Sequence, residues 1–266
     1  MTTYERRQSL IQILQRQAGT RVPELAKALG VSKGTIRNDL KALEEEGLLT
    51  RVHGGAVLRR QPSQFDSSFG VRFQEHAESK LAIARAAAEL VEDGASIILD
   101  ASTTIYYLAQ QLAHCHRLRV VTNGVEVARL LARDPTNTVV LIGGILNPEG
   151  SSVSGLFSEQ IIRDLHVQQA FVSCSGFSLE RGLTDVHLME AQLKSKAITS
   201  AREVIALVDS SKMGKEDLTS FSAIEQITHL YTDSGITDAW VTCLKEAHIA
   251  FTICSDNDGH VHRGMN

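Results

Sequence analysis

The chain has 266 residues, 43% of them hydrophobic, which suffices for one large domain or two unequal ones with packed cores. Residues 1–18 begin with polar side chains and lack a long apolar run, so they match neither a secretory signal nor a membrane span. The net charge of −4 argues against a nucleic-acid-binding protein, but residues 1–60 hold 11 Lys and Arg against 6 Asp and Glu. This asymmetry predicts a small basic module, able to attract phosphates, on a larger acidic body.

The cysteines and the glycine-rich stretches exclude several other classes of protein. Four scattered cysteines form no C-x-x-C pair, and disulfide frameworks belong to small secreted chains, so we expect reduced thiols in a cytoplasmic protein. Neither G-x-x-x-x-G-K-[ST] nor a strand-linked G-x-G-x-x-G occurs, which argues against nucleoside triphosphates and dinucleotides. We therefore expect no cofactor and no metal.

Residues 1–58 contain three predicted helices. The first has an apolar face and ends at Gly19, and the second is short, with Pro23 in its first turn and Gly30 at its end. Ser32 is a suitable N-cap for the third, which carries apolar residues at 36, 40 and 43. Two helices joined by a three-residue turn that contains Gly indicate a helix-turn-helix, whose second helix enters the major groove.

The opposite face of the third helix is basic, and residues 48–58 read as two strands with His53 at the turn between them. This hairpin predicts a wing whose side chains reach the phosphate backbone or the minor groove. The alternative is a three-helix interaction module with a solvated basic face. The residues predicted to contact DNA are Arg21, Ser32, Lys33, Gly34, Thr35, Arg37, Asn38, Lys41, Arg51 and His53.

The stretch SKGTIRNDLKALEEEGLLTRVHGGA closely resembles the winged helix of DeoR-type bacterial repressors. Their usual pattern is a Ser, two variable positions and T-I-R-R-D-L, followed later by L-x-R-x-H-G-G-A. Asn38 stands where the family most often has a second arginine. Arginine favours guanine edges and phosphates, whereas asparagine pairs with adenine, so the resemblance implies an altered operator preference.

The remaining chain alternates between helical and strand-like segments. Residues 59–72 read as a linker, a long helix is predicted at about 74–91, and residues 255–266 form a tail expected to be disordered. Strands that are apolar throughout indicate a mainly parallel α/β sheet over residues 73–254. The strand-like runs are residues 96–99, 119–121, 138–142, 170–172, 204–208, 230–232 and 249–253.

Small, hydroxylic or charged residues follow most of these strands. In such sheets the ligand lies beyond the carboxyl ends of the strands, so the pattern predicts a polar crevice there. Ser102, Thr103 and Thr104 can offer hydroxyl and N–H groups at a helix N-terminus, a favourable phosphate site; an ordinary N-cap is the alternative. The candidate ligand residues at strand ends are Asp100, Ser102, Thr103, Thr104, Thr122, Asn123, Gly143, Gly144, Ser175, Gly176 and Lys212.

Three further charges follow the run at 170–172. Asp185 lies in a loop, and Glu190 and Lys194 are four apart on one helix face. They form either a surface ion pair or a group that points into the crevice and binds ligand hydroxyls. The same three would have to serve as base and electrophile if the body isomerised or deaminated a sugar phosphate. A body that only oligomerises is a third reading.

The resemblance to DeoR-type regulators extends over about residues 3–254. It implies a C-terminal sensor domain related in fold to ribose-5-phosphate isomerase, glucosamine-6-phosphate deaminase and the CoA transferases. Residues 100–104 would hold a ligand phosphate, and residues 175–177, which include Phe177, would line the same pocket with 182–185, 190–194 and 209–214. The function implied is not enzymatic: a homodimeric or homotetrameric repressor of sugar or sugar-alcohol metabolism, released from its operator DNA by a phosphorylated sugar.

Overall fold

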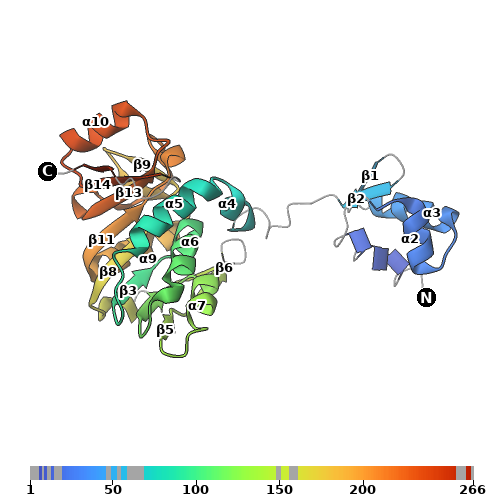
Figure 1. Cartoon of the computed structure of the whole chain (residues 1–266), viewed down its shortest axis with the longest axis horizontal. Coiled ribbons are helices and arrows are strands. Elements are labelled where there is room, and N and C mark those ends of the chain that lie inside the picture. Colours follow the sequence, from blue (N-terminus) through green and yellow to red (C-terminus); the bar gives the residue numbers. More distant parts are fainter. Residues whose placement is uncertain are drawn as a thin grey trace. The chain divides into compact units, whose positions relative to one another are not determined.

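The computed structural model describes residues 6, 7, 9, 10, 13, 14, 20–45, 49–52, 55–58, 69–147, 151–155, 161–255 and 262–264. The chain divides into two compact units, Met1–Ser63 and Gln64–Asn266 (Figure 1). No helix in the described part is long and apolar enough to cross a membrane. All four cysteines are free thiols, as the sequence predicts.

The smaller unit contains the predicted helix-turn-helix and hairpin. Helix α2, Val22–Leu29, ends at Gly30, whose φ of 66° lies in the left-handed region that glycine adopts without strain. Helix α3, Lys33–Glu45, is capped by the Ser32 hydroxyl, which accepts from the Thr35 N–H at 3.0 Å. Strands β1, Leu49–Val52, and β2, Gly55–Leu58, pair antiparallel. The core includes Leu10, Leu14, Leu25, Ile36, Leu40, Leu43 and Leu49.

A buried carboxylate on α3 binds two arginines near the start of the chain. Asp39 is 3% exposed and accepts from Arg6 Nε at 2.6 Å and Nη2 at 3.2 Å. Arg7 Nε adds a longer contact at 3.4 Å. Two of the basic residues in this unit therefore stabilise its fold instead of adding to an external basic face.

The larger unit is built on one eight-stranded sheet that contains all seven predicted strands. The strand order is β15-β14-β13-β11-β8-β3-β4-β5, with every described pairing parallel except that of β15 with β14. The tail was expected to be disordered, but its residues 262–264 form β15. The strands are β3 Ser96–Leu99, β4 Arg119–Thr122, β5 Thr138–Leu141, β8 Val167–Val172, β11 Ala201–Leu207, β13 His229–Asp233, β14 Phe251–Cys254 and β15 His262–Gly264.

Helices cover both faces of this sheet, which explains why its strands are apolar throughout. Along β3, Ile97 and Leu99 belong to a core shared with α5, α6 and α7, whereas Ile98 packs with Leu193 of α9. On that second face, Leu244 of α10 lies in the same core as β11 side chains. The helices are α5 Ala77–Ala88, α6 Thr103–Gln111, α7 Val125–Leu131, α9 Leu188–Thr199 and α10 Asp238–Glu246 (Figure 1).

The N-terminal helix of this unit differs from the single helix predicted at 74–91. Helix α4, Val71–Gln74, ends at Glu75, and α5 starts after His76, whose φ is 50°. Residues 71 and 72, which the sequence places in the linker, are thus helical. The break matters because it turns the chain beside the carboxyl ends of the strands.

Two small antiparallel sheets complete the unit. One has the order β12-β10-β9, and the other is the β6–β7 pair. Gly182 begins β10 with a φ of 65°, and a side chain there would come within 2.0 Å of the Ser222 carbonyl oxygen. Glycine is therefore required at this turn. The strands are β6 Ile145–Asn147, β7 Ser152–Ser154, β9 Gly176–Ser178, β10 Gly182–Asp185 and β12 Thr219–Ser222.

Candidate functional site

A cavity of about 360 Å³ opens where the strand order reverses. From β3 the chain proceeds to β4 and β5 on one side, and from β8 to β11, β13 and β14 on the other. The gap between the ends of β3 and β8 is the usual ligand site of such sheets. Its lining comprises Arg72, Glu75, His76, Lys80, Ala101, Ser102, Thr103, Cys174, Ser175, Asp185, Glu190, Lys194, Asp209, Ser211, Lys212 and Lys215.

The N-terminus of α6 forms one wall. Ser102 is its N-cap, and the Ser102 hydroxyl accepts from the Ile105 N–H at 3.2 Å. Within the described residues, no acceptor takes the N–H groups of Thr103 and Thr104. These groups and the helix dipole favour an anion.

Asp100 shapes this loop instead of lining the cavity. It is 3% exposed, and its two oxygens accept from the Ser102 N–H at 2.7 Å and from the Ser173 N–H at 2.8 Å. It thereby joins the end of β3 to the end of β8. Ala101 packs nearby against Gly124, where an added Cβ would lie 3.1 Å from the Ala101 Cα.

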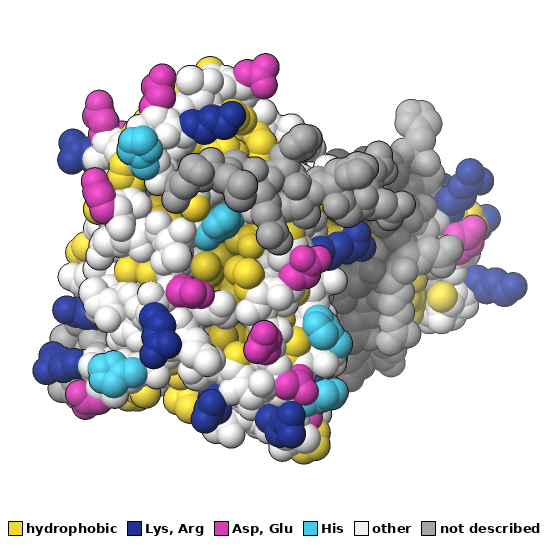
Figure 2. Space-filling view, turned by 60° about the vertical axis from the view of Figure 1, so that its left-hand side comes forward, with side chains coloured by type: hydrophobic (Ala, Val, Ile, Leu, Met, Phe, Trp, Pro, Cys, Tyr) yellow, Lys and Arg dark blue, Asp and Glu magenta, His cyan; other side chains and the backbone are white. Residues whose placement is uncertain are grey.

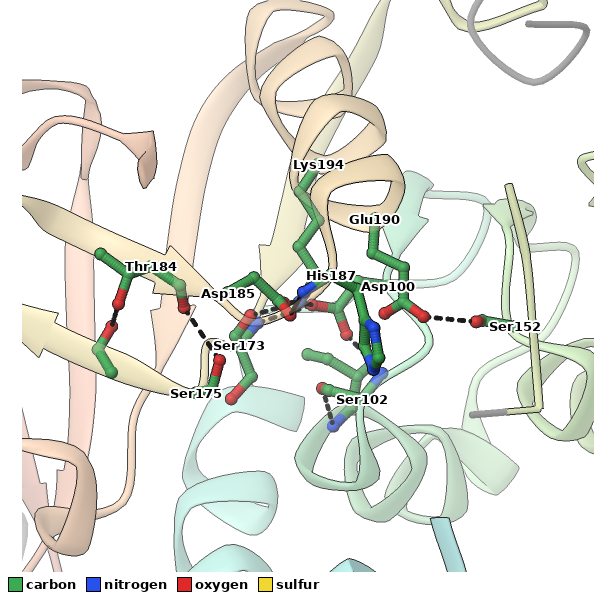
Figure 3. A network of polar contacts seen from close by, with 12 residues as sticks. Asp100, Ser102, Ser152, Ser173, Ser175, Thr184, Asp185, His187, Glu190 and Lys194 are labelled. Carbon is green, nitrogen blue, oxygen red and sulfur yellow. Dashed lines mark hydrogen bonds and ion pairs between the residues drawn. The ribbon is translucent and has the colours of Figure 1, made fainter. Parts of the chain in front are cut away.

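Lys194 is the centre of a buried polar network (Figure 3). Its ammonium donates to Asp185 Oδ2 at 2.7 Å and to the Ser173 carbonyl at 2.8 Å, and it lies 3.3 Å from Asp100 Oδ2. Burial lowers the pKa of Lys194, but the neighbouring carboxylates outweigh burial and raise it. Burial raises the pKa of Asp185, but Lys194 outweighs burial and the net pKa is lowered. Both groups stay charged, so neither exchanges protons readily near neutral pH.

Glu190 lies beside Lys194 on α9, but the two do not form the surface ion pair considered from the sequence. Both are at least 90% buried and point toward the loop that carries Asp100 and Ser102 (Figure 3). Glu190 Oε1 accepts from the Ser152 hydroxyl at 2.6 Å and from Asn147 Nδ2 at 3.2 Å. The β6–β7 pair therefore fixes one carboxylate oxygen, and the side chain lines the cavity.

Lys80 and Lys212 bring positive charge close to the α6 N-terminus. Lys212 Nζ lies 3.3 Å from Asp209 Oδ2 and donates to the Ser173 hydroxyl at 3.2 Å. Lys80, 3% exposed, donates to the carbonyls of Arg72 and, at 2.6 Å, Glu75. Burial and the nearby Lys212 lower the pKa of Lys80 to about 8. A bound anion would compensate this buried charge.

The structure places the other predicted ligand residues outside the cavity. Phe177 is fully buried and lies 6.0 Å from the Trp240 ring, and Gly176 is glycine because a side chain would meet the Lys215 carbonyl at 2.5 Å. Thr122 accepts the Gly124 N–H, which shapes a turn. The strand order places β4 and β5 beyond β3, away from the reversal. The predicted residues outside the lining are Asp100, Thr104, Thr122, Asn123, Gly143, Gly144, Gly176 and Phe177.

The sequence prediction missed the wall formed by α4 and α5. Arg72, Glu75, His76 and Lys80 do not follow a strand, so inspection of strand ends could not reveal them. One signal was available. Lys80 precedes Ala84 by four residues and lies on the apolar face of α5, where a lysine requires partners.

The exposed face of α3 is the second candidate site. Lys33, Arg37 and Lys41 recur at four-residue spacing, and each is exposed, as are Gly34 and Asn38. By contrast, the face of the larger unit shown in Figure 2 mixes basic and acidic side chains. Arg21 and Ser32 are also exposed and Thr35 is half-buried; the Arg51 side chain and His53 lie outside the described residues.

Comparison with known protein families covers both units. The profile described as "DeoR-like helix-turn-helix domain" matches residues 6–61, and the one described as "DeoR C terminal sensor domain" matches residues 75–234. Together they account for the winged helix and most of the cavity walls.

Related proteins match over nearly their full length. The chain is 38% identical to the HTH-type transcriptional regulator GolR of Listeria innocua, covering 95% of this chain and 99% of that protein. It is 34% identical to the lactose phosphotransferase system repressor of Streptococcus mutans, covering 88% and 93%. Among solved structures, ribose 5 phosphate isomerase A from Neisseria gonorrhoeae is similar at a TM-score of 0.37 and 14% identity, covering 50% and 52%. This last likeness concerns the fold alone and carries no statement about chemistry.

Proposed function

This chain belongs to the DeoR family of transcriptional regulators, and from this premise we propose that it represses an operon of sugar or sugar-alcohol metabolism. A phosphorylated sugar in the cavity would release it from operator DNA. Its relatives are named as regulators and repressors, so the chain is a regulator and not an enzyme. The observation that carries the proposal is a basic, exposed α3 in the same chain as a buried cavity with an anion-binding helix N-terminus.

The phosphate is proposed to bind at the α6 N-terminus. Its proposed donors are the Thr103 N–H group and the ammonium groups of Lys80 and Lys212, because these three residues line the cavity. Glu190 would accept from sugar hydroxyls with the oxygen that Ser152 does not fix. The volume of about 360 Å³ suits one small polar molecule.

The exposed face of α3 is proposed to read the operator. Arg37 and Asn38 lie near the N-terminus of this helix, the part that reaches base edges in helix-turn-helix proteins. Lys33 and Lys41 would contact phosphates. Because asparagine pairs best with adenine, Asn38→Arg is expected to change the preferred operator in a binding selection, and an unchanged preference would refute this role.

We also propose that the chain acts as a homo-oligomer, since helix-turn-helix proteins read paired half-sites. Large hydrophobic side chains are exposed in two segments of the larger unit, residues 140–146 and 186–189. The two segments adjoin, because Asn147 of β6 contacts Glu190 of α9. Residues 138–147 carry no charge, and β5 is an edge strand of the sheet. An uncharged, apolar edge of this kind can pack against the same edge of a second copy across a two-fold axis, because no like charges meet.

The decisive experiment is a gel shift with DNA from upstream of the gene, with and without a panel of sugar phosphates. We expect binding that one or a few phosphosugars abolish. Thr103→Ala should still bind DNA but no longer respond to the ligand. Absence of DNA binding at low salt would refute the regulator, and a normal response of Thr103→Ala would place the phosphate elsewhere.

The interface has its own test. Ile145 and Leu218 are 77% and 78% exposed, so Lys at either position should not disturb folding. Only Ile145→Lys, in the uncharged segment, is expected to lower the assembly mass in sedimentation experiments. Equal behaviour of Ile145→Lys and Leu218→Lys would refute this interface.

A further inference from the structure

Helix α4 is the first described helix of the larger unit, and it directly follows the segment that leads from the smaller unit. It has only four residues, none of them buried. A helix this short has little stability of its own, so its position depends on what holds it. Its attachments therefore decide whether the start of the larger unit is fixed or free.

Two donors that line the cavity hold α4 by one carbonyl. The Arg72 carbonyl accepts from the Lys80 ammonium and, at 3.4 Å, from the Thr103 hydroxyl. The Lys80 ammonium also donates to the Glu75 carbonyl, at the end of α4. Thr103 and Lys80 are the same groups that face the proposed phosphate site.

A third attachment lies outside the cavity. The Tyr107 hydroxyl donates to the Phe73 carbonyl at 3.1 Å, and the two rings stack with centroids 4.7 Å apart. Tyr106 contacts the same Phe73 ring edge-on at 5.6 Å. Neither tyrosine belongs to the cavity lining. Aromatic packing on α6 therefore remains when the cavity groups are engaged elsewhere.

We propose that α4 is the element through which the cavity acts, because the ligand phosphate and the Arg72 carbonyl compete for the Thr103 hydroxyl. The threonine hydroxyl has one proton and can donate to only one acceptor at a time. A charged phosphate oxygen is a stronger acceptor than a neutral carbonyl, and the contact it replaces is long. Ligand binding thus loosens α4, where the chain leads to the DNA-binding unit. This inference rests on the proposed phosphate site.

Hydrogen exchange of the full-length chain measures the effect, with inorganic phosphate as the probe. We expect saturating phosphate to accelerate amide exchange in the peptide covering residues 69–76 by about fivefold, the factor that corresponds to one hydrogen bond of roughly 1 kcal/mol. Calorimetry on the same sample separates the two ideas. No phosphate binding refutes the site itself, whereas binding with unchanged or slower exchange refutes only the coupling.

Two matched variants test the coupling without touching the cavity. Tyr107→Phe removes the hydroxyl that holds Phe73 but keeps the stacked ring, and it should accelerate exchange of residues 69–76 without phosphate by about fivefold. Tyr106→Phe is the control, because the Tyr106 hydroxyl makes no hydrogen bond within the described residues. Tyr107→Phe should also weaken binding to the upstream DNA in the absence of phosphate. Identical exchange in both variants would overturn the proposal.

Discussion

The two candidate sites use positive charge in opposite ways. On α3 the basic side chains are exposed and come from a single helix, at a spacing of four residues. In the cavity Lys80 and Lys194 are almost fully buried, and the lining comes from segments between residues 72 and 215. Exposed cations are screened by salt and suit a long polyanion, whereas buried cations need fixed partners and suit one small anion.

The two sites therefore tolerate different substitutions. A residue on the exposed α3 face can change without affecting the core. Its replacement therefore weakens DNA binding and leaves the stability of the fold unchanged. A residue such as Lys194 supports the fold as well as the cavity, because its removal leaves Asp100 and Asp185 buried without their cation. Four changes, given in descending order of expected effect, test this distinction.

Lys194→Met should destabilise the larger unit by about 3–5 kcal/mol, since it breaks a buried charge network. Urea unfolding followed by the fluorescence of Trp240, the single tryptophan, reports on this unit. Lys215→Met is the control: this exposed lysine lines the same cavity, and its loss should change stability by less than about 0.5 kcal/mol. A loss below about 1 kcal/mol for Lys194→Met would show that the network contributes little.

Arg37→Ala should weaken operator binding by about 1–3 kcal/mol, or roughly 5- to 150-fold, without altering the unfolding curve. Fluorescence anisotropy with labelled operator at several salt concentrations measures this. Lys245→Ala, on α10 of the larger unit, should leave the affinity unchanged. If the two variants lose affinity equally, the effect comes from net charge and not from the α3 face.

Phosphate affinity should fall as pH rises above about 8, by at most about tenfold per unit. Burial and Lys212 lower the pKa of Lys80 to about 8, while Asp209 and Glu75 act in the opposite direction. A bound dianion stabilises protonated Lys80, so binding takes up a proton only above this pKa. Calorimetry between pH 7.5 and 9.5 tests it. If the phosphate affinity of Lys80→Met falls with pH in the same way, the proton belongs to another group.

Ser102→Ala and Thr237→Ala each remove an N-cap, from α6 and α10 respectively, and each should cost about 0.5–2 kcal/mol of stability. Only Ser102→Ala should also weaken phosphate binding, because only the α6 N-terminus faces the cavity. Unfolding and calorimetry together separate the two effects. Equal phosphate affinity in both variants would remove the α6 N-terminus from the site.

Features that depend on local periodicity could be predicted from the sequence alone. Ile36, Leu40 and Leu43 fix which face of α3 is buried, and so which face presents Arg37 and Asn38. Apolar runs located all seven predicted strands, and the polar residues after β3 and β8 identified part of the cavity. Both predictions rest on residues that are close together in the sequence.

Which strand ends meet depends on the packing of the whole sheet and could not be predicted. The reversal of strand order between β3 and β8 brings Ser102, Ser175 and Lys212 together and leaves Thr122 and Gly143 aside, although all lie at or after the end of a strand. A break between α4 and α5 at His76 accompanies the placement of Lys80 at the cavity. Helical periodicity does not reveal this break. Strand order depends on long-range packing, which adjacent residues do not encode, so no reading of single segments could have supplied it.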